Sequence, residues 1–105
     1  MTKEFKDMKG VIAIATTPFN NENLIDFESV DRLSNYYIES KVSGVTILGV
    51  MGEAHKLNIE EQKTLIKRYV NNLINSVPVI VGVSNAGLDN LELLSKFSMD
   101  SGASG

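Results

Sequence analysis

Three short apolar runs rich in β-branched residues recur at a fixed interval along the chain. They begin at Val11, Val45 and Val79, so that 34 residues separate each start from the next. None alternates cleanly between apolar and polar residues, which is typical of parallel strands buried on both faces. Helical-hairpin repeats can share this period, but they contain no strand-like runs. The interval therefore predicts repeated strand–loop–helix units. Strands are expected near residues 11–15, 45–48 and 79–83.

The segments between these runs have helical periodicity, and polar residues mark their starts. Asp26 and Asn58 stand where N-cap residues are expected, and Glu61 follows Asn58 at capping-box spacing. Asp89, with Glu92 three residues later, predicts the start of the third helix in the same way. Helices are expected near residues 27–41, 59–75 and 90–101.

Small residues follow the third predicted helix. The segment 101–105, Ser-Gly-Ala-Ser-Gly, resembles the segment 41–44 that leads from the first helix into the second strand. We interpret residues 1–105 as a single partial domain that is cut where a fourth strand would start. The alternative is a flexible Gly/Ser tail that closes a small three-layer domain.

Composition excludes several classes of function. The absence of cysteine rules out a disulfide framework, an iron–sulfur site and a thiol nucleophile. His55 is the only histidine, so no metal site is expected. A net charge of −3 argues against nucleic acid or an anionic membrane surface as a partner. The N-terminus is charged, and no apolar stretch approaches the roughly 20 residues that span a bilayer. A soluble cytoplasmic protein is expected.

The expected binding site lies where the three strands end. Parallel strands collect ligands at their carboxyl ends, so the loops 16–19, 49–53 and 84–87 should lie side by side. In the middle loop, Gly49 and Gly52 would let backbone N–H groups approach an anion. A carboxylate or phosphate is the ligand this favours. The alternative is that the Gly-x-x-Gly turn only connects a strand to a helix.

Other polar residues near these loops have both a functional and a structural interpretation. The hydroxyls of Thr16 and Thr17 could bind a ligand or neighbouring backbone, and the structural role is the more common. Glu53 could act as a general base, but a carboxylate after such a turn more often binds loop amides. His55 is expected to be a solvated loop residue. No dinucleotide-binding glycine motif follows any strand.

An ordered set of motifs resembles one known family. The set comprises Gly10 to Phe19 with its Thr-Pro-Phe ending, Ile25-Asp26, Gly44-Val45, Gly49-x-x-Gly52-Glu53, Leu57 and Glu61. It resembles the opening of the dihydrodipicolinate synthase / N-acetylneuraminate lyase family of class I pyruvate aldolases. The resemblance covers the chain from about Lys9 and continues through the third apolar run and Ser84-Asn85.

The resemblance implies an α/β fold, the first three βα units of a (β/α)8 TIM barrel with its helices outside the parallel sheet. It also implies Schiff-base chemistry on pyruvate or another 2-oxo acid, without a cofactor, in a homo-oligomer. The Schiff-base lysine and the proton-carrying tyrosines would lie beyond Gly105. No catalytic residue is therefore expected within this chain, which alone should be inactive.

For the glycine loop, the resemblance implies substrate binding. The family usually carries two adjacent hydroxyl residues there, one in a proton relay and one on the pyruvate carboxylate. Val50 and Met51 occupy these positions, so only backbone N–H groups, at Met51 and Gly52, remain to bind a carboxylate. The expected substrate-binding residues are Gly49, Val50, Met51, Gly52 and Thr16.

Two further expectations follow from the resemblance. Asn85 matches an effector-side position of bacterial synthases, although Ile59 and Gln62 stand where polar or imidazole side chains are common. The expected reaction joins pyruvate to an aldehyde such as aspartate semialdehyde. The alternatives are a sialic-acid or sugar-acid lyase of the same family, or a non-catalytic fragment with a folding or assembly role.

Overall fold

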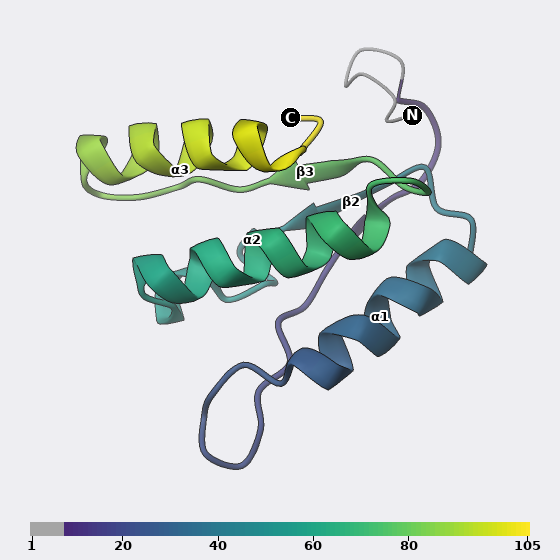
Figure 1. The fold of residues 1–105 in the computed structure, drawn as a ribbon, viewed down its shortest axis with the longest axis horizontal. Coiled ribbons are helices and arrows are strands. Elements are labelled where there is room, and N and C mark those ends of the chain that lie inside the picture. Colours follow the sequence, from purple (N-terminus) through teal and green to yellow (C-terminus); the bar gives the residue numbers. More distant parts are fainter. Residues whose placement is uncertain (1–7) are drawn as a thin grey trace.

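The computed structural model describes residues 8–105, in which three parallel strands alternate with three α-helices (Figure 1). The strands lie in the order β1-β2-β3, so each strand pairs with its neighbour in sequence. The predicted parallel α/β fold is confirmed. The elements are β1 (Ile12–Ile14), α1 (Phe27–Glu39), β2 (Gly44–Ile47), the 3-10 helix η2 (Ala54–Lys56), α2 (Ile59–Leu73), β3 (Val79–Val81) and α3 (Leu88–Ser101).

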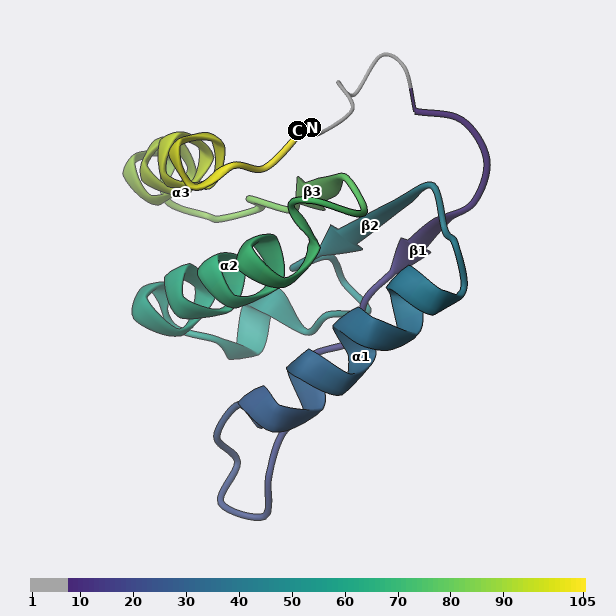
Figure 2. The same cartoon turned by 45° about the vertical axis from the view of Figure 1, so that its right-hand side comes forward.

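The helices cover one face of the sheet. Helix α2 lies between α1 and α3 and contacts both (Figure 2). Beneath the helices, the side chains of Val45, Ile47 and Val79 are buried in one continuous core with Leu65 and Tyr69 of α2. Strand side chains that point to this face therefore hold the helical layer in place.

Among residues 8–105, no helix covers the opposite face of the sheet (Figure 2). Ile14, Thr46 and Ile80 lie side by side across the three strands. Because directly paired residues point to the same face, these three side chains form a row, and Ile14 is 50% exposed. Ile12, on the same face, is also exposed. An apolar sheet surface is thus open to solvent.

The starts of α1 and α2 follow the predicted caps. The Asp26 side chain accepts a hydrogen bond from the N–H of Ser29, and Asn58 and Glu61 form a full capping box. The predicted start of α3 at Asp89 is wrong. The helix begins at Leu88 and its N-cap is Gly87, which has no side chain to cap it. Asp89 instead lies in the first turn, where a carboxylate favours the positive end of the helix dipole.

Several elements end earlier than the periodicity predicts, because individual residues leave the regular backbone conformation. Strand β2 stops at Ile47 because Leu48 has a left-handed φ of 56°. Helix α1 stops at Glu39, and Lys41 also has a left-handed φ of 56°. Strands β1 and β3 and helix α2 are likewise shorter than their predicted ranges.

One polar cluster joins α1 to α2 at the surface. Asp31 accepts two hydrogen bonds from the Arg68 guanidinium, at 2.8 Å and 2.7 Å, and one from Asn72 at 2.8 Å. These bonds lower the pKa of the Asp31 carboxyl to about 2. The carboxylate therefore stays charged, and the contact stays formed, throughout the neutral and mildly acidic range.

The C-terminal segment turns back onto the sheet. Gly102 has a φ of 112°, and a β-carbon there would lie 2.8 Å from the Ile74 side chain. The N–H of Ser104 then donates to Val79 O at 2.8 Å, and the N–H of Val81 donates to Gly105 O at 2.9 Å. The segment is thus bonded beside β3. This placement contradicts the alternative of a flexible tail.

No helix within residues 8–105 combines the length and the apolar character needed to cross a membrane.

The isolated 105-residue chain is expected to self-associate, or to be partly unfolded when dilute. Its uncovered sheet face and the free edge of β1 expose Val11, Ile12 and Ile14. Covering such a surface contributes roughly 25 cal/mol for each Å² of apolar area. Sedimentation equilibrium over a wide concentration range, with circular dichroism alongside, measures this.

A matched variant sharpens the test. Ile12→Lys with Ile14→Lys adds charge to the open face and should weaken the association. A wild-type chain that melts cooperatively as a monomer at micromolar concentration would contradict the prediction.

Candidate functional site

The ends of the three strands converge on the glycine loop, residues 49–53. The Thr17 hydroxyl, after β1, donates to Gly52 O at 2.6 Å. After β3, the N–H of Gly82 donates to Ile47 O at 2.9 Å, next to the start of the loop. Asn85 lies half-buried further along, and no hydrogen bond among the described residues ties its side chain to the glycine loop.

Most of the glycine loop folds on itself through short-range hydrogen bonds. The N–H of Gly52 donates to Gly49 O at 3.2 Å, and the N–H of Glu53 donates to Val50 O at 3.0 Å. Among residues 8–105, the N–H groups of Val50 and Met51 donate to no protein acceptor. The N–H of Gly52, one of the two expected to bind an anion, donates within the turn. Val50 and Met51 thus offer two adjacent unbonded N–H groups.

Backbone geometry at the start of the loop depends on close packing. Leu48 is buried and has a left-handed φ of 56°. Residues other than glycine rarely adopt this backbone conformation. Gly82 faces Leu48, and a β-carbon there would collide with the Leu48 carbonyl oxygen and lie 2.9 Å from its carbonyl carbon. A glycine at position 82 thus leaves room for the turn at Leu48, which sets the direction of the glycine loop. Glu53, at the far end, is also left-handed with a φ of 58°.

The two threonines after β1 differ in environment. Thr17 is 4% exposed and its hydroxyl is bonded to the loop, which matches the structural use predicted for it. Thr16 is exposed, and its carbonyl accepts a hydrogen bond from the Tyr69 hydroxyl at 3.1 Å. Burial raises the pKa of Tyr69, so its hydroxyl keeps its proton and remains a donor. Tyr69 therefore fixes the backbone from which both threonines project.

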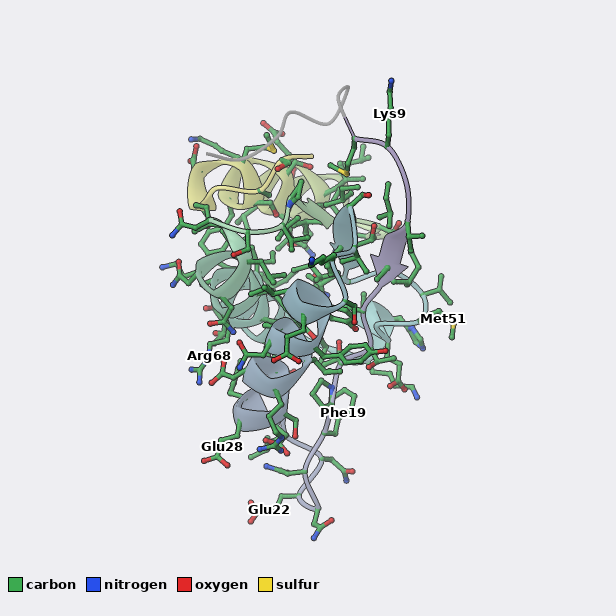
Figure 3. The ribbon with its side chains drawn as sticks, turned by 90° about the vertical axis from the view of Figure 1, so that its right-hand side faces the viewer. Lys9, Phe19, Glu22, Glu28, Met51 and Arg68 are labelled. Atoms are coloured by element: carbon green, nitrogen blue, oxygen red, sulfur yellow. The ribbon has the colours of Figure 1, made fainter. Side chains whose placement is uncertain are left out.

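The side chains of the loop are apolar and open to solvent. Val50 is 85% exposed and Met51 is 65% exposed. Figure 3 shows Met51 pointing away from the ribbon at the edge of the molecule. Neither side chain can donate or accept a proton, so the polar groups that this part of the loop offers are those of the backbone.

Charged residues after the loop satisfy one another. The Lys56 ammonium donates to the Glu53 carboxylate at 2.6 Å at the surface. His55 is exposed in η2, as expected. Gln62 is buried, and its side-chain NH₂ donates to the carbonyls of Ala54 and Leu57, both at 3.1 Å. Within residues 8–105, no group of three acidic, histidine or cysteine side chains could hold a metal ion.

An open cavity of about 400 Å³ lies away from the glycine loop, and no sequence motif indicates it. It lies between the segment 20–27 and the start of α2. Asn58 and Glu61, which line it, are already bonded in the capping box of α2. The polar groups there thus stabilise the helix and do not converge on a ligand.

Comparison with known proteins identifies the family. The model of the Dihydrodipicolinate synthetase family matches residues 7–105. The chain belongs to this family. The predicted resemblance is therefore confirmed.

Individual members of the Dihydrodipicolinate synthetase family match over most of the chain. The 4-hydroxy-tetrahydrodipicolinate synthase of Methanocaldococcus jannaschii is 36% identical over 95 residues, which are 90% of this chain and 32% of that protein. The crystal structure of dihydrodipicolinate synthase from Rhodopseudomonas palustris has a TM-score of 0.93 and 41% identity, covering 100% of this chain and 35% of that chain.

A third relative is the dihydrodipicolinate synthase of Acinetobacter baumannii, solved in complex with pyruvate. It has a TM-score of 0.86 and 27% identity, covering 91% of this chain and 33% of that chain. The chain thus spans about one third of the length of these family members. Its three βα units match the first units of their TIM barrels, and the predicted fold class is confirmed.

The packing of Gly82 against Leu48 can be tested by substitution. Gly82→Ala should destabilise the fold by about 1–3 kcal/mol, because the added methyl group forces the backbone apart. Gly87→Ala is the matched control, since a β-carbon there would meet only the Asn90 side chain at 3.6 Å. Urea denaturation followed by circular dichroism measures both. Equal midpoints for the two variants would mean that the Leu48 turn tolerates the methyl group.

Proposed function

We propose that this chain is the N-terminal part of a pyruvate-dependent Schiff-base lyase or aldolase of the 4-hydroxy-tetrahydrodipicolinate synthase type. The observation that carries the proposal is the pair of available N–H groups at Val50 and Met51, at the carboxyl end of β2. Adjacent backbone donors suit a carboxylate, which every 2-oxo acid carries. The names of the relatives and the pyruvate complex of the Acinetobacter baumannii enzyme support pyruvate as the ligand.

Each residue of the loop has a distinct part in this proposal. The N–H groups of Val50 and Met51 bind the carboxylate. Gly49 leaves the backbone accessible, and the buried Gly52 lets the turn pack closely against Ala15. Thr16, exposed after β1, contributes a hydroxyl on the neighbouring side. The loop holds the substrate but supplies no group that moves a proton.

The chemical step belongs to a longer parent polypeptide, of which these units would form about a third. A lysine amine on a later strand attacks the keto carbon of the bound acid and loses water to form the Schiff base. The Schiff base then loses a proton from the adjacent carbon to give an enamine. That carbon adds to the carbonyl carbon of an aldehyde such as aspartate semialdehyde, and the aldehyde oxygen takes up a proton. Cytoplasmic location, homo-oligomeric assembly and an effector-side role for Asn85 remain predictions from the sequence.

One observation favours a second candidate within the same chemistry. Neither Val50 nor Met51 carries a hydroxyl, so a proton relay cannot run through this loop. A sialic-acid or sugar-acid lyase with a different relay would fit that change. Turnover of the parent on pyruvate plus aspartate semialdehyde, compared with cleavage of sugar acids, separates the two candidates.

The 105-residue chain alone should form no Schiff base. Treated with pyruvate and borohydride, it should show no stoichiometric gain in mass, because the reactive lysine is expected on a later strand. The parent polypeptide, treated in the same way, should gain one adduct. A single-site adduct on the chain itself would contradict the proposal, and so would a parent that forms none.

Restoring hydroxyls to the glycine loop should improve pyruvate use by the parent. Val50→Thr combined with Met51→Thr adds a donor to the carboxylate. Such a bond to a charged group contributes about 1.5–3 kcal/mol, so a gain of roughly 10- to 150-fold in kcat/KM is expected. Val50→Ile with Met51→Leu is the apolar control and should bring no gain. Loss of activity with the fold intact would indicate that the loop binds another ligand.

A further inference from the structure

We propose that Thr17 is a positioning residue, which fixes the glycine loop so that the N–H groups of Val50 and Met51 are held ready for a carboxylate. The inference rests on the proposed function for the identity of the ligand. The contacts that hold the loop stand independently of it.

Thr17 is the loop's one polar anchor to the rest of the fold. Its hydroxyl donates to Gly52 O at 2.6 Å across 35 positions of sequence, and the bond is buried. Among residues 8–105, it is the only hydrogen bond that reaches residues 49–53 from outside the loop and η2. Every other bond of the loop joins residues close in sequence, which fixes the shape of the turn but not its orientation on the sheet.

The anchor is itself held rigidly. Pro18 follows Thr17 and restricts Thr17 to extended backbone conformations. The carbonyl of Pro18 accepts from the N–H of Asp26 at 2.9 Å, and the carbonyl of Thr16 accepts from the buried Tyr69 hydroxyl at 3.1 Å. Residues on both sides of Thr17 are therefore fixed to α2 and to the start of α1.

The orientation of the loop is costly without such an anchor. Leu48 and Glu53, at its two ends, both have left-handed φ angles, which are unfavourable for residues other than glycine. The carbonyl that Thr17 holds belongs to the peptide unit between Gly52 and Glu53. Removing the bond would free this peptide to relax, and the neighbouring Val50 and Met51 would move with it. Donors that are fixed before the ligand arrives bind it better than donors that must be ordered.

The test uses the parent polypeptide with three variants. Thr17→Val keeps the shape and removes the hydroxyl, and Thr17→Ser keeps the hydroxyl. Thr64→Val is the matched control, because it deletes an exposed threonine hydroxyl that bonds only within α2, to Glu60 O. Hydrogen exchange of a peptide covering residues 48–57 and steady-state kinetics with pyruvate are measured for each, with thermal melting as the check on folding.

We expect Thr17→Val to raise the exchange rate of this peptide and the KM for pyruvate, each by up to about tenfold, the scale of one buried hydrogen bond. kcat should change less, Thr17→Ser should behave like wild type, and Thr64→Val should change neither quantity. A purely structural role would lower the active fraction and leave KM unchanged.

Two results would overturn the inference: unchanged exchange in Thr17→Val, or an unchanged KM in an active Thr17→Val enzyme. If the wild-type parent neither turns over pyruvate nor is trapped with it by borohydride, the proposed function fails. The exchange comparison then decides by itself whether Thr17 holds the loop.

Discussion

Burial of one sheet face beneath α2 is the interaction on which the rest of the structure depends. Leu65, Ile66, Tyr69 and Val70 are fully buried there, in one core with the inward side chains of β2 and β3. This packing aligns the three strands side by side in one sheet, because each βα unit places its strand against the same helical layer. The carboxyl ends of the strands then gather at one edge, and the loops that follow them come together. Helix α2 also reaches this edge through the Tyr69 hydroxyl.

The architecture could be predicted because its signals are local and repeated. Apolar runs marked the strands, and Asp26 and Asn58 marked helix starts through side chains that cap the backbone. The third helix start was misplaced because Asp89 satisfies the same pattern from within the first turn. Several predicted helices and strands also extend beyond the observed ones. Leu48 is buried and Lys41 is exposed just after the end of α1, yet both have a left-handed φ, which neither residue type predicts.

The gathering of the loops at one edge of the sheet could be predicted, but the hydrogen bonds within them could not. Two glycines after a strand end indicated an anion-binding loop, and the strand order brings that loop beside the Thr-Pro-Phe segment. Which N–H groups are available depends on the internal bonds of the turn, and these withdraw Gly52 and leave Val50 and Met51. The contact between Thr17 and Gly52 crosses 35 positions, and the closeness of Gly82 to Leu48 spans a similar interval. Contacts of this kind follow from the assembled fold, and no periodicity encodes them.

The bonding of Ser104 and Gly105 to β3 has a consequence for how such a sheet grows. The residues that leave α3 are hydrogen-bonded along the edge of β3. Any strand that continued from this point would have its register set by pairing with β3. Since domains generally form from the N-terminus during synthesis, each finished strand can serve as the template for the next. The register of the whole sheet would then depend on the first pairing, that of β1 with β2.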